Sequence, residues 1–355
     1  MSEVKKFAPV GGVLPDPIEN EGKNWPFLGA EDDWEEEEES GDWGQFRSPP
    51  EKQASKYSDP FWCVSIPVAR QIEKKLHRLM AKNPDLRPLF DFLGLLHKDG
   101  YADISERFIA KGSGTIPGLG NSQHNVYEFV RKNGFVGEKH WPANAEMTEA
   151  QQYSELTPEV IALGKKVLEY IGFNYKDVDE KPDDRKAALK RSSLGVVVGN
   201  AYFGDEQGAR LYRNSGTPTY DHQLEIYKQD RNVEISNEVI PIIDRVEDSY
   251  EPFLKDYVGT YPFKYVKIIK LTLKKKLPMF RLAKTASSPA VFILCEASLS
   301  RLGIADSSEV EGLTGGTLLK LFCGNYGNAG IALISEEEMS RYKHEGNINA
   351  DLFNK

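Results

Sequence analysis

The stretch that decides the fold is DPFWCVSIPVARQIEKKLHRLM, residues 59–80, which joins a lone cysteine to a helical pattern. We expect Ser65 to cap this helix and Pro67 to lie in its first turn, which leaves Cys63 just outside. Cys63 is therefore either a buried small hydrophobe or a thiol placed at a helix start for chemistry. Apolar residues recur three and four positions apart, as on one face of an amphipathic helix, at Ile66, Ala69, Ile72, Leu76, Leu79 and Met80.

The composition bounds the class of protein. The chain has 355 residues, of which 40% are hydrophobic and 11% aromatic, enough for one large domain or two. Three cysteines are too few for a disulfide framework and predict free thiols in a reducing compartment such as the cytoplasm. Cys295 and Cys323 lie in apolar runs and fit core positions. Residues 1–20 lack the apolar core of a secretory signal, and runs such as AVFILC are too short to span a bilayer, so we expect neither a signal peptide nor a membrane span.

The net charge of −9 is concentrated in EDDWEEEEE, residues 31–39, which holds eight acidic residues. The remainder of the chain is nearly neutral, which argues against nucleic acid as a partner. We expect the acidic run to be solvated, because like charges repel. Residues 1–58 carry glycine or proline every few positions and predict an irregular arm. The arm also holds spaced aromatic residues that we expect to pack against the body: Trp25, Phe27, Trp34, Trp43 and Phe46.

Helical signals dominate the first half of the chain beyond this arm. DISERFIAKGSGT predicts a short helix with Asp103 as a possible N-cap. NSQHNVYEFVRKNG predicts a second helix, capped by Asn121 or Ser122 and closed by Gly134. TPEVIALGKKVLEYIG predicts a third helix, which Thr157 caps.

The pattern then changes to strands. FNYKDVD, LGVVVGNAYF, YDHQLEIYKQ, NVEISNEVIPII and KYVKIIKLTL are rich in β-branched and aromatic residues. Beyond about Lys284, SPAVFILCE and LLKLFCGNYGNAGIALIS predict strands of a small separate unit. A helix-rich half followed by a strand-rich half predicts an α+β fold with two lobes.

Several of these segments resemble parts of papain-like cysteine peptidases. PPEKQ followed by DPFWCVS and a long helix resembles their start, where a glutamine precedes the catalytic cysteine. YDHQLEIYKQD resembles the strand that presents the family's histidine, and IIDRVEDSYEPFLKDY the segment with its orienting Asn or Asp. Gln53, Cys63, His222 and Asp248 follow the family's order of roles. The overall sequence of residues 41–258 is similar to the sequences of divergent papain-like proteins from bacteriophage and metagenomic sources.

The resemblance implies a papain-like two-lobed fold, with a helical lobe around the Cys-bearing helix and then an antiparallel β lobe. On this basis the irregular arm covers residues 1–48 and the papain-like domain residues 49–283. The helical lobe covers about 49–192 and the β lobe about 193–283. A small C-terminal α+β unit covers residues 284–355.

The resemblance also implies a peptidase or isopeptidase that forms an acyl-enzyme on Cys63. The positive end of the helix and the imidazolium of His222 favour the thiolate, and the imidazolium then protonates the leaving amine. Asp248 orients the imidazole, and Gln53 donates a hydrogen bond to the oxyanion. The implied partner is a peptide or protein substrate, and no cofactor or metal is expected.

The sequence departs from the family's pattern at three points. Gln53 lies ten residues before Cys63, a longer gap than in familiar members. Asp248 stands where Asn is more usual. Pro67 keeps Cys63 out of the helix, which weakens the effect of the helix dipole on the thiol.

Other residues compete for the same roles. Asp244 lies four residues before Asp248 and is a rival orienter, and His140 in EKHWP is a backup base. His222 alternates with apolar neighbours on its predicted strand, so it is either a core histidine or a catalytic one.

Signals for other chemistry are weak. The sequence holds no CxxC, no HExxH and no His/Cys cluster at metal-ligand spacing. GSGTIPGLG, residues 112–120, lacks the strand-to-helix setting and the GK[ST] ending of a phosphate-binding loop. Residues 264–284 hold eight basic residues and no acidic one. They form either a solvated face or a contact with the acidic arm, nucleic acid or a partner.

The sequence therefore predicts a papain-like cysteine peptidase. The alternative is a catalytically silent papain-fold interaction protein, for example a structural component of a virus particle with virion or host protein partners. In the enzyme, the arm would lie across the cleft and restrain activity, so that deleting residues 1–48 raises turnover.

Overall fold

The computed structural model describes residues 13–14, 34–49, 57, 60–199, 211–212, 220–235, 238–247, 254–258, 263–274, 280–284, 291–295 and 331–334. The chain packs into two compact units: Met1–Lys82 with Phe90–Lys275, and Asn83–Leu89 with Lys276–Lys355. Among the described helices, none is both long and apolar enough to cross a bilayer. The predicted site residues Gln53 and Asp248 lie outside the described residues, as do Cys323, Trp25 and Phe27.

Helix α1, Ser65–Lys82, is the predicted helix after Cys63. Its apolar stripe packs inward, and Ile72 and Leu76 are fully buried. The other described helices are α2 (Arg87–Phe92), α3 (Glu106–Gly112), α4 (Gln123–Asn133), α5 (Glu149–Gln152), α6 (Pro158–Tyr170) and α7 (Pro182–Leu189), with short 3-10 turns η3 (Gly44–Phe46), η4 (Pro84–Leu86) and η5 (Glu138–His140).

The helix caps follow the sequence signals with two corrections. Ser65 was the expected cap of α1, but it is the first residue of that helix, and its buried hydroxyl has no hydrogen-bond partner among the described residues. Ser122 accepts a hydrogen bond from the backbone N–H of Asn125 and caps α4, which ends at Gly134 as predicted. Thr157 caps α6. Asp103 was the expected cap of α3, but Ser105 takes this role by accepting from the N–H of Phe108. Ser105 lies directly before the helix, which is where a short side chain reaches the third N–H.

The strands of the second half form one sheet. They are β3 (Ile171–Val178), β4 (Leu194–Gly199), β5 (Leu211–Tyr212), β6 (Tyr220–Ile235), β7 (Glu238–Glu247), β8 (Leu254–Val258) and β9 (Phe263–Leu273), in the order β3-β9-β4-β6-β7-β8-β5. Every pair in this sheet is antiparallel except β5 with β8. The α+β fold class, with helices first and a mainly antiparallel sheet second, is confirmed. The segment NVEISNEVIPII, predicted as one strand, contains the end of β6 and the start of β7, where Ile235 pairs with Glu238.

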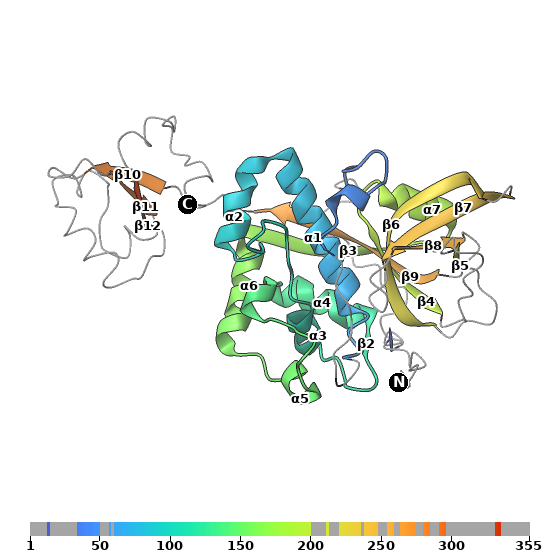
Figure 1. The fold of residues 1–355 in the computed structure, drawn as a ribbon, viewed down its shortest axis with the longest axis horizontal. Helices are drawn as coiled ribbons and strands as arrows, with labels where there is room; N and C mark the ends of the chain where they lie inside the picture. Colours follow the sequence, from blue (N-terminus) through green and yellow to red (C-terminus); the bar gives the residue numbers. More distant parts are fainter. Residues whose placement is uncertain are drawn as a thin grey trace, which may run out of the picture. The chain divides into compact units, whose positions relative to one another are not determined.

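Helix α1 packs against α3 and α4 on one side and against β4, β6 and β9 on the other, whereas α7 lies on the sheet itself (Figure 1). Its Gln71 side chain donates hydrogen bonds to the backbone oxygens of Ser193, at the entry to β4, and of Lys267 on β9. A different set of sheet residues forms an extensive apolar cluster. It includes Leu194 and Val196 of β4, Leu224 and Ile226 of β6 and Val266 and Ile268 of β9. These residues alternate along their strands with those that meet α1, as the two faces of a sheet require.

The described part of the arm belongs to this core. Trp34 and Trp43 are buried members of the same apolar cluster, and the indole of Trp43 donates to the carbonyl oxygen of Leu189. The prediction that arm aromatics pack against the body is confirmed for these two residues and for Phe46, which packs against the same cluster. The acidic run, expected to be solvated, is instead partly fixed, because Glu37 pairs with Lys75 and Arg78 of α1.

In the second unit, β10 (Phe280–Lys284), β11 (Val291–Cys295) and β12 (Ile331–Ile334) form an antiparallel three-stranded sheet in the order β10-β11-β12. The strand predicted in SPAVFILCE is β11, and β12 lies in the segment that ends in GIALIS. Cys295 is the last residue of β11.

Candidate active site

Cys63 lies in the turn that begins α1. The N–H groups of Ser65 and Ile66 both donate to the carbonyl oxygen of Trp62, at 2.8 and 3.1 Å, so the first turn of the helix closes around the cysteine. Cys63 therefore lies two residues before α1, outside the helix as predicted. Its side chain is fully buried, with an exposed fraction of 0%.

The neighbours of this turn come from the helical half. Trp62 packs with Ile66 of α1 and Ala110 of α3, and Tyr153 donates a hydrogen bond to the carbonyl oxygen of Pro60. The chain is thus pinned on both sides of Cys63, which fixes where the thiol sits relative to the start of α1.

His222 lies near the start of β6, opposite Val198 of β4, and is 8% exposed. Because side chains alternate between the two faces along a strand, the His222 side chain lies on the same face as that of Leu224, which is the apolar face of the sheet. The register between β4 and β6 shifts at Val198/Gly199, beside His222. A bulge of this kind bends the strand and changes the direction of nearby side chains, and bulges are common beside active sites.

Two hydrogen bonds along α1 show which end of the sheet faces Cys63. Lys75 reaches the carbonyl oxygen of Arg191, and Gln71, one turn nearer the start of α1, reaches that of Ser193. The start of α1 therefore lies toward the end of β4 that contains Val198. Because Val198 pairs with His222, the start of α1 and the His222 end of β6 lie toward the same end of the interface.

The rival residues have other partners. Asp244 of β7 is fully buried and accepts hydrogen bonds from Arg185, at 2.6 Å, and from Gln229, at 2.7 Å. Burial raises the pKa of Asp244, and Arg185 opposes that shift. The ion pair with Arg185 accounts for the buried carboxylate of Asp244, so this carboxylate needs no role as the orienter of His222. His140 lies in η5, on the helical side, against Gly94. Burial lowers its pKa.

A short segment of the arm bridges the two halves. Strand β1, Val13–Leu14, pairs in parallel with β2, Asn121–Ser122, just before α4. The same segment lies against β6. The arm thus touches both the helical side and the strand of His222, and Val13 is buried there.

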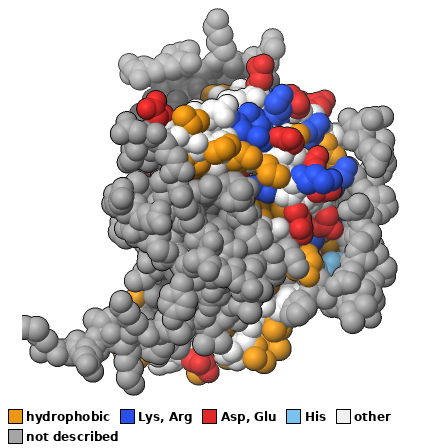
Figure 2. All heavy atoms as spheres, turned by 90° about the vertical axis from the view of Figure 1, so that its right-hand side faces the viewer, with side chains coloured by type: hydrophobic (Ala, Val, Ile, Leu, Met, Phe, Trp, Pro, Cys, Tyr) orange, Lys and Arg blue, Asp and Glu red, His pale blue; other side chains and the backbone are white. Residues whose placement is uncertain are grey.

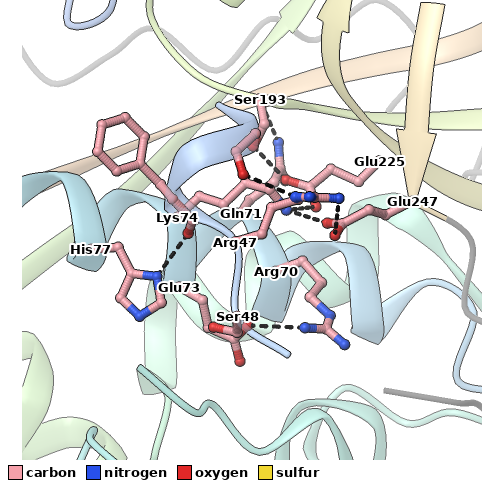
Figure 3. A network of polar contacts seen from close by, with 12 residues as sticks. Arg47, Ser48, Arg70, Gln71, Glu73, Lys74, His77, Ser193, Glu225 and Glu247 are labelled. Atoms are coloured by element: carbon pink, nitrogen blue, oxygen red, sulfur yellow. Dashed lines mark hydrogen bonds and ion pairs between the residues drawn. The ribbon is translucent and has the colours of Figure 1, made fainter. Parts of the chain in front are cut away.

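A buried polar network lies beneath α1 (Figure 3). Lys74 is fully buried and sits between two carboxylates, Glu225 of β6 at 2.6 Å and Glu247 of β7. Ser193 also donates to Glu225. Burial raises the pKa of Glu225 to about 7, with Lys74 opposing. Burial also disfavours the ionised form of Glu247, but Lys74, Arg70 and Arg47 outweigh this and lower its pKa.

The opposite side of the same helical turn holds the end of the arm. Arg70 donates to the carbonyl oxygen of Pro49, and Glu73 accepts from the N–H of Ile104 at 2.9 Å. Ser48 donates to the carbonyl oxygen of Ala102. Burial raises the pKa of Glu73 to about 7, and the charge of Arg70 opposes this shift. These contacts anchor the chain just before the segment that contains Gln53.

Sequence reasoning missed this network. The charged residues of α1 fall between its apolar positions, which is the pattern of a solvated helix face. In the structure they are buried because α1 is covered on both sides. The buried charged and polar residues of α1 are Ser65, Arg70, Gln71, Glu73, Lys74, Lys75 and Arg78.

The outer surface shows other features of the sheet half. Figure 2 shows acidic and basic side chains interspersed on the described part of one face. Ion pairs of this type include Lys228 with Asp42 and Arg245 with Asp230. Among the described residues, no group of three His, Cys, Asp or Glu side chains could hold a metal ion.

Two hollows are formed by described residues. One, of about 560 Å³, is lined by residues such as Asp42, Tyr227 and Arg245, and the other, of about 430 Å³, lies between Trp34 and the last turns of α1. Neither hollow is lined by Cys63 or His222, so neither exposes the thiol.

The sequence matches no protein-family model and no curated protein. In structure, the chain is similar to papain-like cysteine proteases at low sequence identity. Xylellain, a cysteine protease from Xylella fastidiosa, matches with a TM-score of 0.47 and 15% identity over 73% of this chain and 95% of that one.

Two further solved structures are similar over a smaller share of their length. The cysteine protease and lectin-like domains of Cwp84, a surface layer associated protein of Clostridium difficile, match with a TM-score of 0.46 and 15% identity over 70% of this chain. The Amb a 11 cysteine protease, a major ragweed pollen allergen, matches in its proform with a TM-score of 0.42 and 14% identity over 64% of this chain. This chain spans 55% of the Cwp84 chain and 65% of the Amb a 11 chain.

Proposed function

We propose that the protein is a papain-like cysteine peptidase or isopeptidase. What supports this most is the packing of α1 against the sheet, which brings the start of the helix beside Cys63 and the His222 end of β6 toward the same end of one interface. A thiol and an imidazole must meet to form the nucleophilic pair. Because His222 shares the face of Leu224, which points away from α1, the pair requires the imidazole to reach Cys63 around the end of β6.

In the proposed reaction, the Cys63 thiol gives its proton to His222 and the thiolate attacks the carbonyl carbon of an amide. The tetrahedral intermediate collapses, the C–N bond breaks, and His222 returns the proton to the leaving amine. Water then hydrolyses the thioester. Asp248 orients the imidazole, and Gln53 donates a hydrogen bond to the oxyanion. The substrates are peptides or proteins.

We further propose that the structure represents a latent form. Cys63 is fully buried, and no substrate can reach a thiol in that state. Strand β1 pairs with β2 and lies against β6, which puts this part of the arm between the two halves of the proposed cleft. Displacing β1 would then be a condition for activity.

The burial of Cys63 also favours a second candidate. In a catalytically silent interaction protein, the same cysteine is simply a core residue, which is the commoner role of a buried thiol. The protein would then serve as a scaffold, for example as a structural component of a virus particle that binds virion or host proteins.

The reactivity of Cys63 separates the two candidates. In a full-length chain carrying Val13→Asp and Leu14→Asp to displace β1, we expect iodoacetamide to modify Cys63 at pH 6 about 100-fold faster than N-acetylcysteine. The reason is that an ordinary thiol, with a pKa of about 8.5, is almost wholly protonated at that pH. Mass spectrometry of the Cys63 peptide measures the rate.

The control adds His222→Ala to the same chain and should bring the rate back to that of the free thiol. If Cys63 in the β1 variant reacts no faster than N-acetylcysteine, the peptidase proposal is wrong and the scaffold is favoured.

A further inference from the structure

The buried ion cluster beneath α1 connects the two elements that carry the proposed nucleophile and base. Lys74 belongs to the helix that starts after Cys63, and Glu225 lies three residues after His222 on β6. Their charged atoms are 2.6 Å apart, and both side chains are 1% exposed. The cluster is completed by Glu247 on β7 and by the hydroxyl of Ser193.

Both connections are short, and all but the turn at Cys63 and Val64 is regular secondary structure. Eleven residues separate Lys74 from Cys63, or about 16 Å at the rise of an α-helix. Three residues separate Glu225 from His222, or about 10 Å along a strand. A displacement of Lys74 relative to Glu225 therefore moves the start of α1 relative to the His222 end of β6.

Stability alone is a weak reason for such a cluster. Removing three charged groups from water has a large cost, and apolar side chains of the same volume often fold as well. A charged cluster differs from an apolar contact in its direction, because the ammonium has to lie between the two carboxylates. An apolar contact specifies the register of α1 on the sheet less sharply, because several packed arrangements of similar volume satisfy it.

We propose that Lys74 and Glu225 are positioning residues that hold α1 in one register on β6 and thereby set the distance between the Cys63 sulfur and the His222 ring. This inference rests on the proposed function. Neither residue touches the reacting atoms, and their effect on catalysis passes through the two elements.

Helix α1 itself offers a matched control. Lys75, the next residue, is buried to the same extent and pairs with Glu37 at 2.6 Å. Glu37 belongs to the arm and not to the sheet. Burial lowers the pKa of Lys75 to about 8, and Glu37 opposes this shift. Removing the Glu37 charge disturbs a buried lysine on the same helix but leaves the contact of α1 with β6 in place.

The experiment compares Glu225→Gln with Glu37→Gln, each in the full-length chain carrying Val13→Asp and Leu14→Asp. The readout is the ratio of the alkylation rates of Cys63 at pH 6.0 and pH 8.5, which reports the thiolate fraction held by the imidazolium. We expect Glu225→Gln to lower this ratio about 10-fold and Glu37→Gln to leave it unchanged. With a peptide substrate, Glu225→Gln should lower kcat and change KM by less than about twofold.

A second variant covers the case in which Glu225→Gln fails to fold. Lys74→Met combined with Glu225→Met and Glu247→Gln replaces the whole ion cluster by uncharged side chains, and it should fold while showing the same fall in the ratio. The inference is overturned if the folded variants keep the parent ratio, or if Glu37→Gln lowers it as much.

The same measurement distinguishes a failure of the proposed function. If the proposed function is wrong, the alkylation rate of Cys63 in the parent chain has the pH dependence of a free thiol, whether or not His222 is present. The positioning role is then wrong as well. If the parent shows a His222-dependent ratio and Glu225→Gln does not change it, only the positioning role is wrong.

Discussion

At the residue scale, the main feature of this protein is the set of ionisable side chains buried along one helix. Glu73 and Lys74 are adjacent in sequence but face different structures. Glu73 accepts from Ile104 in the helical half, and Lys74 pairs with Glu225 in the sheet half. One turn of α1 therefore holds both halves of the first unit, and the ionisation of its residues is coupled to folding.

Glu73 gives a prediction about pH and stability. Its pKa rises from 4.5 to about 7 on folding because of burial. A raised pKa stabilises the native state below the unfolded pKa, and this contribution is lost as the pH rises through the folded pKa. Glu73→Gln avoids the ionised form, so relative to the wild type its free energy of unfolding should rise by ~3 kcal/mol between pH 4.5 and pH 8. Urea denaturation at several pH values measures the difference.

Glu128 provides the control for this prediction. Burial opposes its ionised form, but hydrogen bonds from Arg131, Lys132 and Tyr175 outweigh burial and lower the pKa of Glu128 to about 2. The stability from this carboxylate is fully present above pH 4.5 and is lost only as the pH falls toward 2. The difference between Glu128→Gln and wild type should therefore be flat between pH 5 and pH 8. A flat difference for Glu73→Gln as well would contradict the account given for Glu73.

At the element scale, local signals defined the helices better than the strands. The caps Ser122 and Thr157 and the end at Gly134 could be predicted because capping depends on residues adjacent in sequence. The β6–β7 hairpin was predicted less well, because residues 232–243 are β-rich on both sides of the turn. Pairing of Ile235 with Glu238 depends on the partner strand, which local composition does not reveal.

The contact between α4 and α6 gives a second prediction. Gly134 ends α4 with φ of +78°, and a Cβ on it would lie 1.9 Å from the carbonyl oxygen of Gly164 in α6. Gly134→Ala therefore adds a backbone clash to an unfavourable conformation, and we expect it to destabilise the fold by about 3 kcal/mol or more. Thermal unfolding followed by circular dichroism measures the loss.

A substitution at Gly118 separates the effect of the unfavourable backbone conformation from the effect of the clash with α6. It has φ of +76°, but no atom lies within 4 Å of the position that a Cβ would take. Gly118→Ala has the unfavourable backbone alone and should cost about 1 kcal/mol. Equal losses for the two variants would show that the clash with α6 is relieved by movement.

At the scale of the whole molecule, the arm has two different roles. The segment with Trp34 and Trp43 is part of the core, and Glu37 ties it to α1. Strand β1, further toward the start of the chain, bridges β2 and β6. The sequence-based experiment of deleting residues 1–48 combines the two, because it removes buried tryptophans together with the proposed inhibitory strand.

Two truncations should therefore behave differently. Deleting residues 1–30 removes β1 and keeps both tryptophans, so we expect a folded chain with faster alkylation of Cys63. Deleting residues 1–48 removes Trp34 and Trp43, each worth about 3–5 kcal/mol, which is comparable to the whole stability of a domain. That chain should lose its cooperative thermal transition. A folded and active chain after the longer deletion would mean that the tryptophans contribute little.

The sequence by itself determined the helical first half, the strand-rich second half and the place of Cys63 just before α1, because periodicity and capping depend on neighbours within a few positions. The site residues Gln53, Cys63, His222 and Asp248 stay predictions from the sequence. Only the tertiary structure decided that Cys63 is buried, that the charged residues of α1 are internal and that Trp34 and Trp43 belong to the core. These features depend on which distant segments cover a residue, as when Glu225 meets Lys74 across 151 positions.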